Sequence, residues 1–197
     1  MSSADERLVE HRIGGRTVLE GGFLEVRRDD VALPDGGRTT REYIQHPGAA
    51  AVLPLLDDGR VVLVRQFRYP VAKTLIEIPA GKIDAGESTL DCARRELREE
   101  TGFSAREWAF ACEIHNAAAY STESIWLYFA RGLSAGAQQL DAGEFVEVLN
   151  LNEAELDALA AGHGLPDVKT RIALQWLQRW RAGAWPLTWQ TDPSAAL

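Results

Sequence analysis

The chain has few cysteines and no excess of positive charge, and each absence argues against a class of protein. Cys92 and Cys112 are the only cysteines in 197 residues. Neither has the paired spacing of metal-binding cysteines, so we expect two reduced thiols packed in the core. The formal net charge of −8 argues against a protein that binds nucleic acid through its phosphate backbone.

Long apolar runs are also missing, and no segment reaches the length that crosses a membrane. Residues 1–12 are charged and lack the apolar stretch of a secretory signal. We therefore expect a cytoplasmic protein with no membrane partner. Hydrophobic residues nevertheless make up 46% of the chain, which is enough for a substantial core and predicts one main domain with a small appendage.

Acidic side chains are concentrated between residues 81 and 103, where the chain reads GKIDAGESTLDCARRELREETGF. The pattern predicts a helix over residues 88–101, capped by Ser88 and ended by Gly102. Helical spacings of three and four residues gather side chains on one face. Crowded carboxylates repel one another unless a cation lies between them, and Mg²⁺ prefers oxygen ligands of this kind. The carboxylates in question are Glu87, Glu96, Glu99 and Glu100.

Short strand patterns separated by turn residues precede this segment. The glycine pairs at 14–15 and 21–22 read as turns. We expect residues 1–47 to form a small antiparallel β subdomain and residues 48–197 to form the main domain. The predicted strands of the subdomain cover residues 16–20, 23–28 and 40–45.

The main domain alternates strands with helices, which predicts an α/β (α+β) fold: an α/β/α sandwich with a mixed sheet. Residues 50–56 and 61–69 read as buried strands joined by an Asp-Gly turn. The tail at residues 185–189 either packs back on the domain or meets a partner. Further strands are predicted at 109–114, 124–130 and 144–151, and further helices at 152–161, opened by Asn152, and 167–182, opened by Asp167.

The segment that begins at Gly81 resembles the Nudix box, G-x5-E-x7-R-E-U-x-E-E-x-G-U with U a bulky apolar residue, and agrees with it at every defined position. An acidic helix face alone is more often a solvated surface with ion pairs such as Arg95–Glu99. The added glycines, the loop glutamate and the arginine make this pattern specific. The chain is therefore identified as a member of the Nudix hydrolase superfamily, which hydrolyses nucleoside diphosphates linked to a further group.

Flanking segments resemble the ADP-ribose pyrophosphatase branch of that superfamily. They are residues 41–49, 65–70 and 77–87, which read REYIQHPGA, RQFRYP and EIPAGKIDAGE. The resemblance implies an enzyme that uses Mg²⁺, with Mn²⁺ as an alternative, to split the nucleotide sugar ADP-ribose into AMP and ribose 5-phosphate. It also implies a homodimer in which the N-terminal subdomain is exchanged between chains.

The resemblance further implies roles for individual residues. The main-chain oxygen of Ala80 and the carboxylates of Glu96 and Glu100 would bind the metal, with Glu99 nearby. Arg95 would orient these acids through salt bridges without binding the metal itself, and Glu87 and Gly81 would support the site in the same way. The candidates for contact with the substrate are Arg68 first, and then Arg41 and Glu77.

A carboxylate must also accept a proton from the attacking water. The branch places such acids in a late loop, which corresponds here to the segment around residues 140–147. Glu144 matches the acid before the last strand and is the first candidate. The position two residues earlier is Ala142, which leaves Asp141 as the second candidate and Glu99 as the third.

One segment leaves the substrate open. The branch often shows Ser-Pro-Gly before an aromatic residue after the box, whereas residues 117–123 read AAAYSTE, with Ala118 at the proline position. GDP-mannose or another nucleotide sugar or dinucleotide is therefore the alternative substrate. A non-catalytic nucleotide-sugar sensor is the alternative function, although the complete set of box acids favours catalysis. Net charge argues against an enzyme acting on RNA ends, and the β subdomain argues against a housecleaning triphosphatase.

Overall fold

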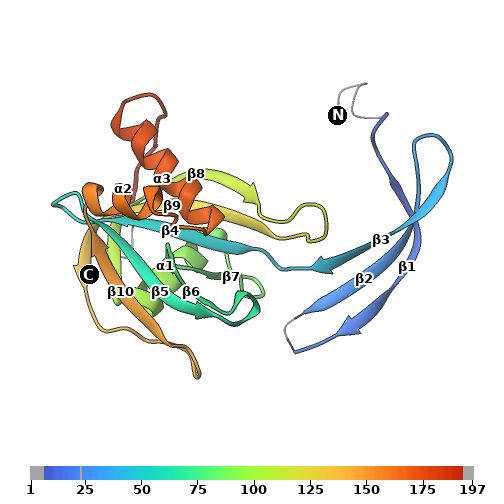
Figure 1. Cartoon of the computed structure of the whole chain (residues 1–197), viewed down its shortest axis with the longest axis horizontal. Coiled ribbons are helices and arrows are strands. Elements are labelled where there is room, and N and C mark those ends of the chain that lie inside the picture. The colour runs from blue at the N-terminus through green and yellow to red at the C-terminus, as the bar shows by residue number, and fades with distance from the viewer. Residues whose placement is uncertain (1–6, 23, 193–197) are drawn as a thin grey trace. The chain divides into compact units, whose positions relative to one another are not determined.

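The protein is described by a computed structural model that covers residues 7–22 and 24–192. The chain divides into two units, one of Met1–Pro47 with His115–Glu123 and the other of Gly48–Ile114 with Ser124–Leu197. The first unit is a small sheet, and the second holds the large sheet and the α-helices (Figure 1).

The first unit is a three-stranded antiparallel sheet in the order β1-β2-β3. The main chain of Ile44 bonds with Tyr120 and Thr122, so the loop at 115–123 belongs to this unit. Its second strand was predicted from Phe23, which lies outside the described residues. The strands are β1 (His11–Glu20), β2 (Glu25–Ala32) and β3 (Arg38–Gln45).

The predicted turn at Gly14 and Gly15 is wrong, because both glycines lie inside β1. Gly15 lies opposite Asp29, and a Cβ at Gly15 would lie 2.0 Å from the Asp29 carboxylate. That carboxylate is buried and accepts hydrogen bonds from Arg12 and Tyr43, both at 2.9 Å. The glycine thus permits close approach across the strands instead of reversing the chain.

The second unit is built on an eight-stranded sheet. Its main path has the order β10-β5-β4-β9-β8-β11, with β6 beside β5 and β7 beside β4. β4 is parallel to β9 and antiparallel to β5 and β7, so the sheet is mixed as predicted. The strands are β4 (Ala49–Leu55), β5 (Val61–Arg68), β6 (Lys73–Glu77), β7 (Ala80–Lys82), β8 (Phe103–His115), β9 (Ser124–Ala135), β10 (Val146–Leu151) and β11 (Gln190–Thr191).

Three α-helices cover this sheet: α1 (Thr89–Thr101), α2 (Glu153–Ala161) and α3 (Val168–Arg181). A 3₁₀ turn at Tyr69–Val71 follows β5. The predicted caps Ser88, Asn152 and Asp167 each accept a backbone N–H at the start of their helix. In Figure 1 α1 lies on one face of the sheet and α2 and α3 on the other, which confirms the α/β/α sandwich.

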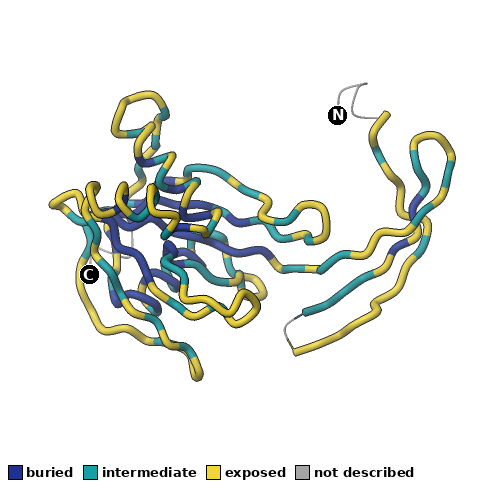
Figure 2. The backbone as a smooth tube through the Cα atoms, in the orientation of Figure 1, coloured by how far each residue is buried: buried dark blue, intermediate teal, exposed yellow. Residues whose placement is uncertain are grey.

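Alternate residues of β4 explain how both helical layers attach. Ala51 and Leu53 pack with Leu177 of α3, whereas Ala50 and Val52 pack with Leu97 of α1. A strand buried on both faces must be apolar throughout, and Figure 2 shows it as a continuous buried run.

Two strands are longer than predicted. β8 and β9 extend beyond the predicted segments 109–114 and 124–130. The added part of β8 mixes exposed and buried positions, and the added part of β9 is half-buried to exposed, so neither has the uniformly apolar sequence on which the prediction relied. Cys92 and Cys112 are free thiols. Among the described helices, none is long and apolar enough to cross a membrane.

Candidate active site

The site is built where β7 enters α1. β7 pairs with the first residues of β4, and Ser88 and Gly102 cap the two ends of α1. The buried face of α1 fixes the helix against the sheet, so its acids are held in place by the core. A Cβ added to Gly81 would lie 1.8 Å from the Glu96 oxygen Oε1. Glycine at this position therefore leaves the space that the Glu96 carboxylate occupies.

Glu96 and Glu100 are both buried, with 9% and 4% of their surface exposed. Burial raises the pKa of Glu100 to about 8, and the charge of Glu96 adds to the rise. Burial likewise raises the pKa of Glu96. The Ala80 N–H donates to Glu100 at 3.2 Å. Two buried carboxylates whose negative charge is incompletely balanced form a donor set that suits a hard divalent cation.

Within the described part of the chain, no three His, Cys, Asp or Glu side chains are grouped as a metal site by themselves. Mg²⁺ commonly uses one or two carboxylates and completes its shell with water and substrate phosphates. Glu96, Glu100 and the main-chain oxygen of Ala80 fit that pattern. They would hold the ion at the β7–α1 junction.

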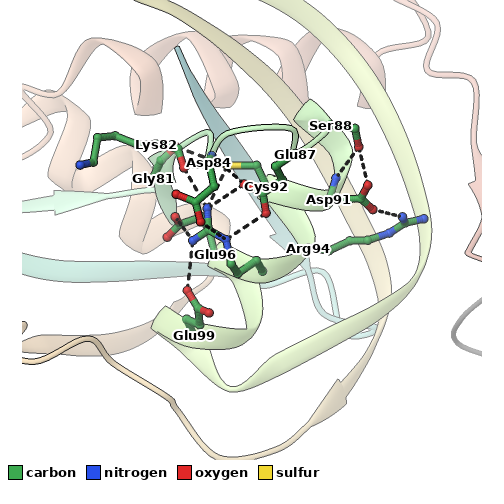
Figure 3. A network of polar contacts seen from close by, with 11 residues as sticks. Gly81, Lys82, Asp84, Glu87, Ser88, Asp91, Cys92, Arg94, Glu96 and Glu99 are labelled. Carbon is green, nitrogen blue, oxygen red and sulfur yellow. Dashed lines mark hydrogen bonds and ion pairs between the residues drawn. The ribbon is translucent and has the colours of Figure 1, made fainter. Parts of the chain in front are cut away.

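Arg95 connects the acids around this pair. Its guanidinium donates to Glu87 through two bonds of 3.0 Å, to Glu96 at 2.6 Å and to Glu99 at 3.1 Å. It also donates to the Lys82 carbonyl at 2.8 Å. Figure 3 shows Glu87, Glu96 and Glu99 converging in this network. Arg95 therefore has the contacts expected of a residue that orients the acids.

Glu87 supports the loop more than it faces the carboxylate pair. Its carboxylate accepts the backbone N–H of Asp84 at 3.1 Å as well as both bonds from Arg95. The bonds from Arg95 lower the pKa of Glu87. Glu87 is thus ionised and fully engaged, as expected for a residue that holds the loop.

Arg68 and Glu77, two candidates for substrate contact, are bound to each other. Arg68 donates to both Glu77 oxygens, at 2.8 and 2.9 Å. Glu77 is buried and also accepts from Lys169. Burial alone would raise the pKa of Glu77, but Arg68 and Lys169 outweigh it and lower the value to about 2. Glu77 is therefore placed to position Arg68, whose side chain remains 40% exposed.

Lys169 is the residue that sequence reasoning missed. It lies in the first turn of α3 and reaches Glu77 across 92 residues of sequence. A lysine near the start of a predicted helix gives no indication in the sequence that it makes such a contact. The burial of Lys169 is the feature that points to it, and burial is known only from the fold.

The loop acids lie in a tight turn. The Glu144 N–H donates to the Asp141 carbonyl at 3.0 Å, and the Asp141 N–H donates to the Glu144 carboxylate at 3.3 Å. Burial is the main cause of the raised pKa of Glu96 and of Glu100, and the charge of Glu144 makes a small further contribution to both. The structure thus brings Glu144 into electrostatic range of the box acids.

The loop that carries Glu144 is anchored at the end of α1. The Gln139 N–H donates to the Glu99 carbonyl at 2.9 Å, and the Gln138 side chain donates to the Glu100 carbonyl at 2.5 Å. These bonds satisfy helix carbonyls that would otherwise lack partners. The anchor holds the start of the loop beside the acidic end of the helix.

Arg41 lies on β3 in the first unit. Its guanidinium binds Glu10, through Nε at 2.9 Å and through a second nitrogen at 2.5 Å. Its contact with a substrate stays a prediction.

Comparisons with known proteins agree with this geometry. Residues 45–167 match the family model described as NUDIX domain, and residues 10–44 match one described as nucleoside diphosphate sugar hydrolase N-terminal domain. A Bacillus subtilis (strain 168) protein named ADP-ribose pyrophosphatase is 36% identical over 87% of this chain and 94% of its own length.

Two further relatives extend the comparison. A Bacillus methanolicus protein named methanol dehydrogenase activator is 37% identical over 86% of this chain and 92% of its own. The crystal structure of an ADP compounds hydrolase superposes with a TM-score of 0.80 at 23% identity, covering 89% of this chain and 96% of that one. At that identity the superposition establishes the fold.

Proposed function

The chain belongs to the Nudix family of hydrolases, and from that premise we propose that it hydrolyses the pyrophosphate bond of a nucleoside diphosphate sugar, with ADP-ribose as the preferred substrate and Mg²⁺ as the cofactor. The observation that carries the proposal is the buried pair Glu96 and Glu100 beside Gly81. Relatives named ADP-ribose pyrophosphatase at 36% and 40% identity support the choice of substrate.

The chain's own residues divide the chemistry among them. Glu96, Glu100 and the Ala80 carbonyl would hold Mg²⁺, which supplies positive charge to neutralise the diphosphate and activate water. Arg68 presents its guanidinium to a substrate phosphate. Arg95 joins Glu87, Glu96 and Glu99 and orients them. Positioning and charge stabilisation supply most of the rate in phosphoryl transfer of this kind.

Glu144 accepts the proton of the attacking water. Its support is its place in the loop before β10 and its charge influence on both Glu96 and Glu100, whereas Glu99 accepts a hydrogen bond from Arg95. Asp141 shares the same turn and is the alternative base. Attack in line at one phosphorus breaks one P–O bond and expels a phosphate monoester, so that ADP-ribose and water yield AMP and ribose 5-phosphate.

We further propose that the protein acts as a homodimer. The support is the resemblance of residues 1–47 to the exchanged subdomain of the branch. Apolar side chains on β1 are also exposed, with Val18 at 46% and Leu19 at 52%. We propose that these side chains contribute to the surface between the two chains, since larger exposed apolar surfaces often mark sites of association.

The test is product analysis with purified protein, Mg²⁺ and a panel of ADP-ribose, GDP-mannose, ADP-glucose, NADH and deoxynucleoside triphosphates. AMP formed fastest from ADP-ribose supports the proposal. Faster turnover of GDP-mannose would replace ADP-ribose by the alternative substrate that the alanines at 117–119 leave open. If no compound of the panel is hydrolysed although nucleotides still bind, the protein would be a nucleotide-sugar sensor and not an enzyme.

Variants of the carboxylate pair make the test specific. Glu96→Gln and Glu100→Gln should each lower kcat by about 100-fold or more while the fold is kept, because each removes a charge from the cation site. Glu113→Gln, on an exposed position of β8, is the matched control and should leave kcat unchanged. Near wild-type turnover in either box variant would refute the metal assignment.

A further inference from the structure

Lys169 is a buried lysine close to Arg68, the cationic side chain that we assign to the substrate phosphate. Only 8% of its surface is exposed, which is rare for lysine unless the ammonium is paired. Its Nζ donates to Glu77 and, at 3.1 Å, to Asp167. Lys169 lies two residues past the stretch 45–167 that matches the NUDIX model.

The first turn of α3 also holds the neighbouring backbone. Asp167 accepts the N–H and hydroxyl of Thr170, at 2.9 and 2.6 Å. The Thr170 hydroxyl in turn accepts the Ile78 N–H at 2.9 Å. Two consecutive residues of α3 thus bind two consecutive residues at the end of β6. Lys169 binds the side chain of Glu77, and Thr170 binds the main chain of Ile78.

Glu77 passes this constraint on to Arg68. Both Glu77 oxygens accept from the Arg68 guanidinium in a planar fork, a geometry that fixes the plane of the arginine. Arg68 is also within electrostatic range of Glu100. The set runs from the start of α3 to the exposed guanidinium in the order Asp167, Lys169, Glu77, Arg68, and its two middle members are buried.

A second cation shares the Glu77 carboxylate. Lys169 and Arg68 both donate to it, and Lys169 also pairs with Asp167, so the two cations and the two carboxylates balance. Because Lys169 takes up part of the Glu77 charge, Arg68 keeps more of its own charge for a phosphate, and its side chain is the most exposed of the set. Partly buried charges are screened less by salt than exposed ones.

We propose that Lys169 is a positioning residue, which fixes Glu77 and thereby orients Arg68 toward the pyrophosphate of the substrate. The inference rests on the proposed function, because it assigns Arg68 to the substrate phosphate. Lys169 itself does not touch substrate. Its effect on catalysis therefore passes through Arg68.

The test is a double-mutant cycle in kcat and KM for the best substrate of the panel. Lys169→Met should raise KM by about tenfold with a smaller change in kcat, since a misplaced binding group costs roughly this much. Lys169→Arg should recover most of the loss because it keeps the charge. In an Arg68→Gln background, Lys169→Met should change KM by less than about twofold, because its route is already removed.

Lys73→Met is the matched control. Lys73 lies directly opposite Arg68 on β6 and is exposed, so its loss removes the same charge without touching Glu77. It should leave KM unchanged. An unchanged KM in Lys169→Met, or an equal rise in KM with and without Arg68, would overturn the proposal and leave Lys169 a merely structural residue.

A second readout needs no turnover. The Arg68 Nε–H, identified by its loss in Arg68→Gln, should give a slowly exchanging ¹⁵N signal in the wild type and in Lys169→Arg. Its exchange should become about tenfold faster in Lys169→Met, as the fork loosens. If the wild type hydrolysed nothing, the proposed function would fail while this measurement still decided whether Lys169 orients Arg68; unchanged exchange would reject it.

Discussion

Gly81 shows how a single absent atom can shape a site. The Glu96 carboxylate lies against its Cα, where a Cβ would approach to 1.8 Å. Backbone strain plays no part, since the constraint is the space occupied by a buried charge. The glycine of the box is thus explained by the acid that follows it fifteen residues later in the printed sequence.

Gly81→Ala should therefore lower kcat at least tenfold by displacing Glu96, because small misplacements of catalytic groups are costly. The measurement is steady-state hydrolysis, with circular dichroism to verify folding. Gly22→Ala, at a glycine with nothing within 4 Å of the added Cβ, is the control. Equal activity in the two variants would contradict the steric explanation.

Glu100 makes the stability of the metal-free protein depend on pH. Burial raises its pKa from about 4.5 to about 8, so the native state retains a proton that the unfolded chain has lost between these values. The free energy of unfolding should consequently fall as pH rises through this window, by at most on the order of 1 kcal/mol per pH unit. Glu77 has the opposite shift and contributes only as pH falls from about 4.5 toward about 2.

Urea unfolding in chelator at about pH 5.5 and about pH 8.5 measures this effect. Glu100→Gln should flatten the dependence, and added Mg²⁺ should restore stability at the higher pH. A variant with the wild-type slope would show that Glu100 does not carry the shift.

At the scale of elements, α1 ends against the loop that follows β9. Gly102 adopts a left-handed conformation with φ of 76°, and a Cβ there would lie 2.5 Å from the Gly136 carbonyl oxygen. Gly183, after α3, has a similar φ of 71° but nothing near its Cβ position. The two positions separate backbone strain from crowding.

Gly102→Ala should lower the free energy of unfolding by about 2–4 kcal/mol, whereas Gly183→Ala should cost only about 1 kcal/mol from strain. Chemical denaturation compares them directly. Similar losses would mean that the contact with Gly136 contributes nothing.

The C-terminal segment packs back on the second unit, which settles the alternative left open for the tail at 185–189. Trp185 meets Trp176 of α3 edge to face and Trp189 packs at a tilt against Trp180, with ring centroids 4.6 and 5.8 Å apart. β11 then adds to the sheet beside β8. The segment thus links α3, the sheet edge and, through Asp192, the box helix.

Asp192 pairs with Arg94 of α1 at 2.7 Å, and only 5% of the Asp192 side chain is exposed. Asp192→Asn should cost about 2–4 kcal/mol, since it leaves the Arg94 charge without its buried partner. Asp91 is the other ion-pair partner of Arg94, and 58% of the Asp91 side chain is exposed. Asp91→Asn should therefore lower the free energy of unfolding by less than about 1 kcal/mol. Thermal or urea unfolding ranks the two variants, and a reversed order would show that the buried Asp192–Arg94 pair does not stabilise the fold.

At the scale of the whole molecule, the proposed dimer predicts a mass by light scattering twice that of one chain. Val18→Asp with Leu19→Asp should shift the protein toward monomer, because charges would enter an apolar surface. Val168→Asp, at an apolar position of α3 with 43% exposure, should leave the mass unchanged. A wild type that elutes and scatters as a monomer would reject the dimer.

The sequence alone determined the main architecture and the box. Apolar runs, caps and period predicted the buried strands, the three helices and the sandwich, because these signals are local and β4 must be apolar on both faces. The acids of α1 were found for the same reason, since helical spacing fixes which side chains meet. The turn predicted at Gly14 and Gly15 was wrong because a turn and a close contact between strands both favour glycine.

Only the tertiary structure decided which charges are buried and paired. The contacts of Lys169 with Glu77, of Gly81 with Glu96 and of Asp192 with Arg94 join residues far apart in the chain. Local patterns carry no record of such contacts, because burial is a property of the packed layers. The physical reason is that a charge acquires its pKa and its partner from the space around it, and that space exists only after folding.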